Sequence, residues 1–343
     1  MNIAEIRELA NSNEYDFLRD DKRLGDNIIL LTLGGSYAYG MNNENSDIDF
    51  RGIALNSKDD ILLGNDFEQI LGGEDTTIYS FNKIIELLSK CNPNTIEMLG
   101  CLPEHYIRLN KIGKELIENR KMFLSKICIH TFGGYANSQL RRLENKANRL
   151  VGQSQNEAYI LKSIQNAKFD FKNRYYPHDE NDVKLYIDKS EQEGFESEIY
   201  MDVNLKHYPL RDWAGMWNEM KTIVSSYTKI GKRNEKAISH DKLGKHMAHL
   251  IRLYMMGIDI LEKEEIITYR ENEHDLLMDI RNGKYLDSNR QPTSDFYDIL
   301  NEYEKKFDYA KENTSLPDLP DYKRIREFKA YVNEMIVRGE YGT

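Results

Sequence analysis

Proline, cysteine and long apolar runs are all scarce in this chain. Only 7 of the 343 residues are proline, so we expect long helices with few interruptions. The three cysteines, Cys91, Cys101 and Cys128, include no CxxC pair, which favours reduced thiols, and their spacing with His105 matches no zinc-ligand pattern. No apolar run approaches the ~20 residues that a membrane-spanning helix needs, and the charged N-terminal segment is not typical of a signal peptide. These absences predict a cytoplasmic protein with no membrane partner.

An excess of basic residues is also missing. The net charge of −10 argues against broad, sequence-independent binding to nucleic acid, which needs a basic surface, although a local basic groove remains compatible with it. The composition, 40% hydrophobic and 30% charged, is typical of a globular chain. The length is sufficient for two domains.

The first hundred residues show the pattern of short strands joined by short helices. A continuous apolar run at 27–35 predicts a buried strand that ends in a glycine turn. Alternation at 47–55 predicts a second strand, and β-branched and aromatic residues at 74–81 predict a third. Helical patterns occupy 2–10, the short "SYAYG" segment and 82–91, and another helix is expected to start at Asn92-Pro93.

From about residue 111 the spacing of apolar residues becomes helical. Helices are predicted within 116–150, with a kink at "FGG" (132–134), and over 151–172, 209–229, 240–263, 272–282, 295–310 and 321–338. The polar, aromatic stretch 173–206 is interpreted as an irregular insertion or a hairpin. The predicted fold class is therefore α+β: a small α/β domain with a short mixed sheet over 1–110, followed by a mostly helical domain over 111–343.

Two carboxylates stand in the second predicted strand. Asp47 and Asp49 are two residues apart, so on a strand they project from one face. Carboxylates that close raise each other's pKa, and a bound divalent cation removes this conflict. Carboxylate oxygens suit Mg²⁺ or Mn²⁺, which makes this pair a candidate metal site.

A glycine turn precedes the carboxylates by about a dozen residues. Residues 34–36 read Gly-Gly-Ser, and a glycine turn between a strand and a helix exposes backbone N–H groups that favour phosphate oxygens. The hydroxyl of Ser36 adds a further donor. A third carboxylate, Asp75 or Glu74, would complete a metal site for phosphoryl or nucleotidyl transfer.

These residues resemble the DNA polymerase β nucleotidyltransferase superfamily, whose signature is a Gly-Ser turn followed by an Asp-x-Asp strand. The closer resemblance is to a branch of predicted bacterial and phage nucleotidyltransferases linked to RNA repair. The matching residues are Gly35-Ser36-Tyr37-Ala38-Tyr39-Gly40, Ser46-Asp47-Ile48-Asp49-Phe50-Arg51-Gly52, Asp75, Tyr79, Asn92-Pro93-Asn94, Glu97 and Leu99, with further similarity at 245–257 and 276–285.

The resemblance implies a set of catalytic and nucleotide-binding residues. It implies that Asp47, Asp49 and Asp75, rather than Glu74, are the catalytic residues and metal ligands. It also implies that Ser36 contacts the nucleotide phosphates. Gly35, Tyr39 and Arg51 are further nucleotide-binding candidates on the same motif.

Cations on the helix predicted at 240–263 are candidates for holding the triphosphate. Lys245, His249 and Arg252 fall at i, i+4 and i+7, so they share one helix face. Such a face suits phosphates, but a solvated basic face or a histidine in the core would give the same pattern. Candidate contacts to RNA are Arg142, Lys146 and Arg149, the basic stretch 229–236 and the aromatic stretch 169–176, for which a solvated surface is the alternative.

The sequence therefore favours a Mg²⁺-dependent nucleotidyltransferase that moves NMP from an NTP to an acceptor hydroxyl. An RNA 3′ end, such as that of tRNA, is the first choice of acceptor. The alternatives are nucleotidylation of a protein, as by an AMP-adding antitoxin, nucleotidylation of a small molecule, and a non-catalytic nucleotide-binding module.

Overall fold

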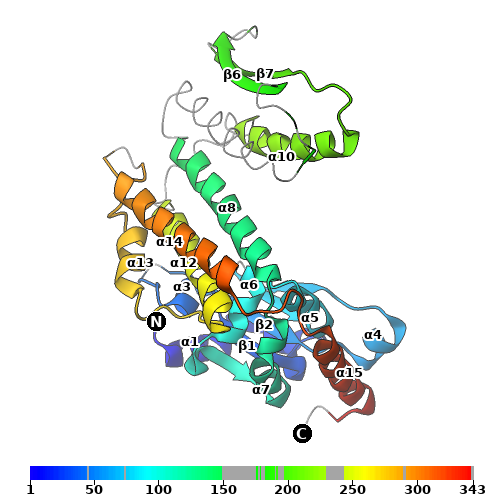
Figure 1. The fold of residues 1–343 in the computed structure, drawn as a ribbon. Coiled ribbons are helices and arrows are strands. Elements are labelled where there is room, and N and C mark those ends of the chain that lie inside the picture. The colour runs from blue at the N-terminus through cyan, green and yellow to red at the C-terminus, as the bar shows by residue number, and fades with distance from the viewer. Residues whose placement is uncertain are drawn as a thin grey trace. The chain divides into compact units, whose positions relative to one another are not determined.

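The computed structural model of the chain describes residues 1–44, 46–72, 75–148, 175–176, 178, 182–189, 191, 197–228, 243–288 and 291–340. The chain forms two compact units. Unit 1 comprises Met1–Asn137, Ala248–Ile280 and Tyr297–Thr343, and unit 2 comprises Ser138–Met247 and Arg281–Phe296. Figure 1 labels most of the helices and several strands of the two units.

Unit 1 is built on a mixed five-stranded sheet. Its strands are β1 (Ile28–Leu33), β2 (Phe50–Ala54), β3 (Gln69–Gly72), β4 (Thr76–Ser80) and β5 (Tyr106–Leu109), in the order β3-β4-β2-β1-β5. β2 and β4 run parallel, and the other neighbouring pairs are antiparallel. The three predicted strands correspond to β1, β2 and β4, and the mixed sheet followed by helices confirms the predicted fold class.

The second strand begins later than the sequence pattern predicts. The ladder starts at Phe50, which pairs with Leu33 on one side and with Thr76 on the other. Asp47 and Asp49 precede this strand, so the prediction that both lie within it is wrong. Phe50 is fully buried whereas Asp47 is exposed, and burial of the apolar residue sets the point at which regular pairing begins.

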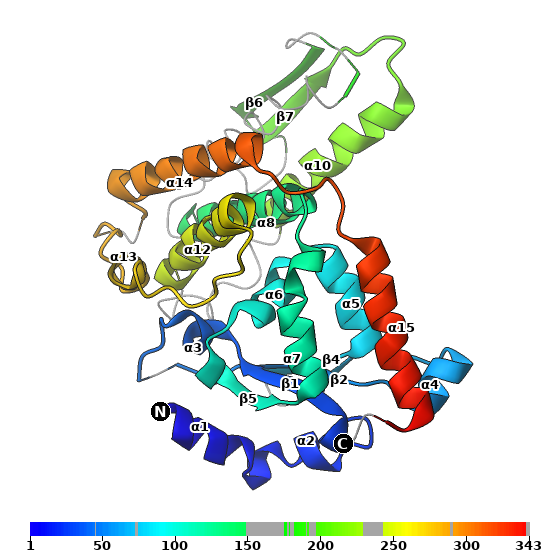
Figure 2. The same cartoon turned by 60° about the horizontal axis from the view of Figure 1, so that its bottom comes forward.

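Helices cover both faces of the sheet. On one face, α1 (Ile3–Ala10) and α2 (Phe17–Asp20) contribute Ile6 and Leu18 to a core with Leu31, Phe50 and Ile78. On the other face lie α5 (Phe81–Ser89) and α7 (Lys111–Glu118), and α15 (Tyr322–Arg338) packs on α5 (Figure 2). Shorter elements connect these parts: α3 (Gly35–Tyr39), α4 (Lys58–Leu63), α6 (Pro93–Ile96), and the 3-10 turns η1 (Asn13–Tyr15), η2 (Gly25–Asn27), η3 (Glu97–Gly100), η4 (Pro103–His105) and η5 (Arg120–Phe123).

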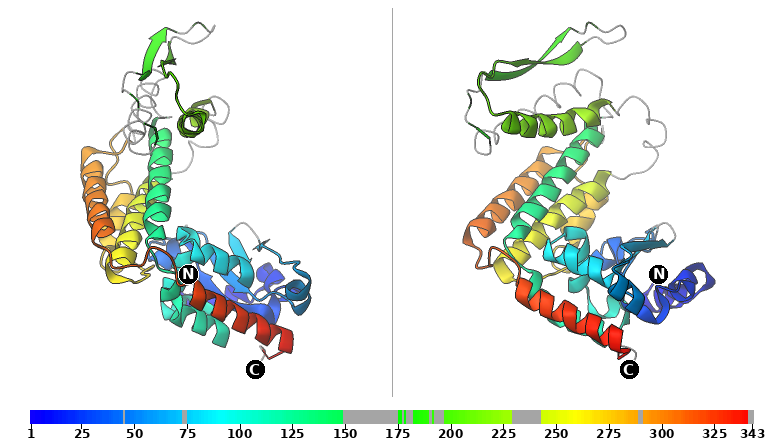
Figure 3. Two further views of the ribbon diagram at one scale, coloured as in Figure 1. Left: turned by 45° about the vertical axis from the view of Figure 1, so that its right-hand side comes forward. Right: turned by 90° about the vertical axis from the view of Figure 1, so that its right-hand side faces the viewer.

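The longer helices are α8 (Ile127–Asn148), α12 (Leu243–Lys263) and α14 (Ser294–Asn313), with the shorter α13 (His274–Arg281) between the last two along the chain. α8 runs through "FGG" as one continuous helix, and the kink predicted there stays a prediction. A glycine of α12 permits close packing: a Cβ on Gly257 would lie 2.7 Å from the ring of Phe307 on α14 and 3.4 Å from Phe132 on α8. Figure 3 shows α12, in yellow, beside α14, in orange, and the first part of α8, in green.

Unit 2 contains a β-hairpin and a long helix. β6 (Val183–Lys189) and β7 (Ser197–Val203) pair antiparallel, with Val183 opposite Val203. Within the stretch 173–206 the structure thus contains the hairpin that was one of the two interpretations. α10 (Leu210–Thr228) follows it in the chain. The predicted helix at 151–172 lies outside the described residues.

The two units divide the chain differently from the predicted boundary near residue 110. α7, α15, the first part of α8 and most of α12 belong to the unit that holds the sheet. In the parts of the chain covered by the structure, no helix is both long enough and apolar enough to cross a membrane.

Candidate active site

Three strand ends meet at one edge of the sheet. β1 ends next to the point where β2 begins because the two strands are antiparallel, and β4 begins beside β2 because that pair is parallel and in register. This arrangement brings Gly34, Asp49 and Asp75 together. The amide of Gly34 donates to the carbonyl of Asp49 (2.8 Å), and the amide of Phe50 donates to the carbonyl of Asp75 (3.2 Å).

The glycine turn lies directly against one of the predicted catalytic carboxylates. Gly35 has a φ of +52°, and a Cβ built there would lie 1.8 Å from Oδ2 of Asp49. A side chain at this position is therefore excluded by sterics as well as by the backbone conformation. Ser36 follows in α3 and is partly exposed, and its carbonyl accepts a hydrogen bond from the amide of Met41 (2.8 Å).

Arg51 ties the starts of β2 and β4 together. Its Nη1 donates to the carbonyl of Asp75 at 2.8 Å and to the carbonyl of Phe50 at 3.0 Å. Its Nη2 lies 3.9 Å from Oδ1 of Asp49. The guanidinium therefore holds the backbone next to the third carboxylate and supplies a positive charge near Asp49.

The electrostatics of Asp49 reflect its crowded position. Burial is the main reason why its pKa is raised; the neighbouring charges of Asp75, Asp47 and Glu97 raise it further, and Arg51 opposes the shift. Asp49 is partly buried, while Asp47 and Asp75 are exposed. Because Asp75 and Asp47 contribute to the raised pKa of Asp49, the three carboxylates lie close enough for their charges to interact.

The chemistry of this donor set fits a divalent cation. Three carboxylates with mutually unfavourable charges are the hard oxygen donors that Mg²⁺ and Mn²⁺ prefer. Among the described residues, no three His, Cys, Asp or Glu side chains converge as a ligand cluster, and Glu74, the alternative third carboxylate, lies outside them. The metal-binding roles of Asp47, Asp49 and Asp75 stay predictions.

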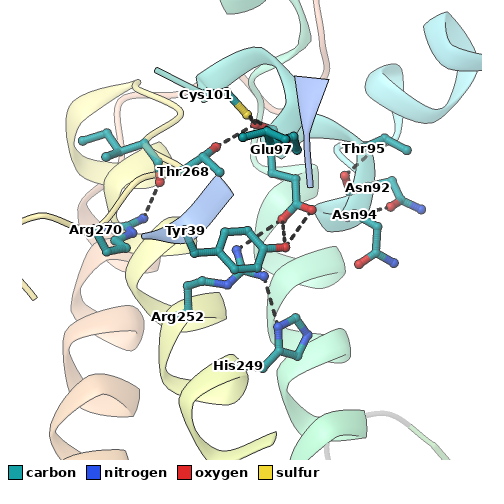
Figure 4. Close-up of polar contacts among 12 residues, drawn as sticks. Tyr39, Asn92, Asn94, Thr95, Glu97, Cys101, His249, Arg252, Thr268 and Arg270 are labelled. Atoms are coloured by element: carbon teal, nitrogen blue, oxygen red, sulfur yellow. Dashed lines mark hydrogen bonds and ion pairs between the residues drawn. The ribbon is translucent and has the colours of Figure 1, made fainter. Parts of the chain in front are cut away.

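The cations of α12 occupy environments different from those expected. Arg252, a predicted nucleotide-binding residue, is 1% exposed and forms an ion pair with Glu97 (Nη1 to Oε2, 3.2 Å). His249 is partly buried and accepts a hydrogen bond from Arg252 at its Nδ1 (3.1 Å; Figure 4). Lys245 is exposed in the first turn of the helix. Nucleotide binding by Lys245 and His249 stays a prediction.

Most of the predicted RNA contacts fall outside the described residues. These include Arg149 and the stretch 229–236. Arg142 and Lys146 lie within α8, but their side chains are outside the description. In the aromatic stretch 169–176, Tyr176 is exposed and meets Tyr208 edge to face at 5.8 Å between ring centroids.

Two tyrosines that interact with charged residues around this site were not assigned a role from the sequence. The pKa of Tyr15 is raised by burial and by the charges of Glu14, Asp75 and Asp49, and its ring packs edge to face on Phe50 at 5.1 Å. Burial also raises the pKa of Tyr79 on β4. The position of Tyr79 four residues after Asp75 in the motif was a signal for it, whereas no sequence pattern marked Tyr15.

The first half of the chain is similar to a known protein family. Residues 2–167 match the model of the RlaP family, described as the RNA repair pathway DNA polymerase beta family. The match confirms the resemblance to DNA polymerase β-type nucleotidyltransferases linked to RNA repair.

A phage protein and the solved structures complete the comparison. An uncharacterized 38.9 kDa protein in the nrdC-mobD intergenic region of Enterobacteria phage T4 is 27% identical over 131 residues, which are 34% of this chain and 39% of that protein. The alignment thus spans about two fifths of the relative's length. No solved structure matches the chain.

Proposed function

We propose, from the match of residues 2–167 to the RNA repair pathway DNA polymerase beta family, that this chain moves NMP from an NTP to an acceptor hydroxyl. One observation carries the proposal: the register of β1, β2 and β4 gathers Asp49 and Asp75 at the edge where the glycine turn approaches the Asp49 carboxylate. The arrangement suits a triphosphate held by the turn beside Asp49 and Asp75.

Each residue of the edge has a role in the proposal. Asp47, Asp49 and Asp75 would hold Mg²⁺ or Mn²⁺, which when bound neutralises developing charge and lowers the pKa of an attacking hydroxyl. The turn at Gly35 and the hydroxyl of Ser36 bind phosphate oxygens. Arg51 keeps the starts of the two parallel strands together, which fixes the distance between the backbones of Asp49 and Asp75.

The reaction is a displacement at the α-phosphorus. The acceptor oxygen forms a bond to that phosphorus, the bond to the β-phosphate bridging oxygen breaks, and pyrophosphate leaves. The proton of the acceptor hydroxyl passes to a carboxylate of the proposed site, for which the exposed Asp75 is our candidate. Positioning and charge stabilisation supply most of the rate acceleration.

An RNA 3′ end, such as that of tRNA, is the acceptor that we propose. The family description links its members to an RNA repair pathway, and RNA repair requires chemistry at RNA ends. Lys245 and His249 are proposed to bind the triphosphate. The basic residues Arg142, Lys146 and Arg149 and the basic stretch 229–236 are proposed to contact the RNA backbone.

Labelled nucleotides test the proposal. The full chain is incubated with each α-³²P NTP, Mg²⁺ and an RNA pool, and label on RNA is expected. Asp47→Asn and Asp49→Asn should each reduce transfer by at least on the order of 100-fold. Asp59→Asn is the matched control, since Asp59 is an exposed carboxylate in the first turn of α4.

The possible results of this experiment distinguish the type of reaction from the identity of the acceptor. Label that appears on protein or on a small molecule, and is lost in Asp49→Asn, would support nucleotidyl transfer and overturn the RNA assignment. Transfer that survives in both aspartate variants would overturn the proposed site. NTP binding with no transfer to any acceptor would favour the non-catalytic nucleotide-binding module.

A further inference from the structure

Three sequence motifs that lie far apart in the chain meet in one buried cluster of unit 1. Tyr39 is the last residue of α3, Glu97 begins η3, and Arg252 lies in the middle of α12. Glu97 and Arg252 are 155 residues apart in sequence. We call Tyr39, Glu97 and Arg252 the buried triad; Figure 4 shows their side chains together.

The contacts within the buried triad are close. The hydroxyl of Tyr39 lies 2.9 Å from both carboxylate oxygens of Glu97. Arg252 donates to Glu97 and lies over the ring of Tyr39, with Cζ 3.4 Å from the ring centroid. The exposed fractions are 9% for Tyr39, 8% for Glu97 and 1% for Arg252. The geometry combines an ion pair with a cation–π contact.

The stability of the fold does not explain this arrangement. A buried ion pair loses the hydration of both charges, and apolar residues of similar volume are often at least as stable. The Nε of Arg252 is buried with no hydrogen-bond partner in the described part of the protein. A function in holding specific geometry accounts for the triad better than a contribution to stability.

The triad is connected to the proposed phosphate site through α3. This helix has five residues, Gly35–Tyr39, so fixing Tyr39 fixes Ser36 within the same turn and a half. The backbone after Tyr39 is held as well: a Cβ on Gly40 would lie 2.5 Å from the ring of Tyr269, and the amide of Arg270 donates to the carbonyl of Tyr39 (3.3 Å). The charge of Glu97 also reaches Asp49, since it contributes to the raised pKa of that residue.

The same arginine determines the tautomer of His249. Nη2 of Arg252 lies 3.1 Å from Nδ1 of His249. Because a guanidinium has no acceptor, Nδ1 must accept the hydrogen bond, and the neutral imidazole carries its proton on Nε2. Tyr135 packs edge to face on the imidazole at 5.8 Å, so the ring is held from two sides.

We propose that Arg252 and Glu97 are positioning residues for the NTP triphosphate: through Tyr39 they fix α3 with Ser36, and through Arg252 they hold His249 with Nε2–H as the donor. Arg252 therefore acts through its neighbours and does not contact phosphate itself. This inference rests on the proposed function and deepens it.

A charge-neutral double variant separates positioning from stability. Glu97→Gln with Arg252→Met leaves no buried charge without a partner, so the melting temperature of the full chain should change by no more than a few degrees. Its Kd for α,β-methylene NTPs and its KM for NTP should both rise about 10-fold or more, because a small displacement of binding groups has a large effect. KM for the RNA acceptor should stay unchanged.

Two further variants sharpen the test. Arg252→Lys retains the charge but not the planar fork that bridges Glu97 and His249, so it should restore only part of the nucleotide affinity. The control is a different polar contact of α12 in unit 1, the hydrogen bond from the hydroxyl of Tyr254 to Oε1 of Glu304 (3.1 Å). Tyr254→Phe with Glu304→Gln should leave the Kd for the analogues within about twofold of the unmodified chain.

Failure of this inference is distinguishable from failure of the proposed function. If the unmodified chain transfers NMP and the Glu97/Arg252 double variant has the same KM and Kd, the positioning role is overturned and the function stands. If the unmodified chain transfers nothing, hydrogen exchange of residues 35–41 decides the inference. Faster exchange in the double variant at unchanged melting temperature supports it, and unchanged exchange overturns it.

Discussion

Asp49 shows at the scale of one residue how the proposed site conflicts with stability. Its carboxylate is partly buried beside the glycine turn, and the charges of Asp75 and Asp47 are near. Burial and these charges disfavour its ionised form, which the proposed metal site requires. A residue placed this way is expected to destabilise the free protein at neutral pH.

Asp49→Asn should therefore stabilise the chain while abolishing transfer. The pKa of Asp49 is raised in the folded state, so the folded chain retains this proton to higher pH than the unfolded chain does. Stability is then lost as pH rises from the unfolded value of about 3.9 through the folded pKa. Without divalent cations, we expect the variant to melt about 2 °C or more above the unmodified chain at pH 7, with a difference that shrinks toward pH 4.

Thermal melts between pH 4 and pH 8 measure this effect. Asp59→Asn, which removes an exposed carboxylate from α4, should show no comparable pH-dependent gain. A lower melting temperature for Asp49→Asn at pH 7 would contradict the explanation, because it would mean that the ionised carboxylate contributes favourably to folding.

At the scale of elements, glycines within helices have opposite effects on stability, depending on the packing around them. Gly257 of α12 lies where a Cβ would be 2.7 Å from the ring of Phe307, whereas a Cβ on Gly134 of α8 would meet nothing within 4 Å. The first glycine allows two helices to approach each other. The second has no packing reason and lowers helix propensity.

The same substitution at these two sites should change stability in opposite directions. Gly257→Ala should destabilise the chain by about 1–3 kcal/mol because it overpacks the contact with α14. Gly134→Ala should stabilise it by about 0.5–1 kcal/mol through helix propensity. Urea unfolding of both variants provides the measurement. Equal shifts of the same sign would show that α12 and α14 adjust freely at Gly257.

The helices and strands also show which parts of the structure could be predicted from the sequence. β1 was predicted because six consecutive buried residues form an apolar run, but β3 has four residues, two of them exposed, and gives no such signal. Helix periodicity placed Arg252 on the same face as Lys245. It did not indicate burial, because the partner Glu97 lies 155 residues away and its approach depends on tertiary packing.

At the scale of the whole molecule, unit 1 is assembled from three separate segments of the chain. Its glycine turn and carboxylates come from the first segment, Arg252 comes from the second, and α15 comes from the third. α15 packs on α5, where Phe328 meets Phe81 at 6.1 Å between ring centroids. The predicted boundary near residue 110 would cut through this unit.

A fragment of residues 1–110 should therefore fail to fold cooperatively. It leaves the buried Glu97 without Arg252 and exposes the face of α5 that α15 covers, and a buried charge without its partner is strongly destabilising. We expect a broad thermal transition by circular dichroism and strong binding of the dye ANS. Residues 1–320, which keep Arg252 and lack α15, should still melt cooperatively but at least about 5 °C below the full chain. If residues 1–110 melted as sharply and at the same temperature as the full chain, the first segment would be an autonomous domain, and neither Arg252 nor α15 would be needed to hold the proposed site together.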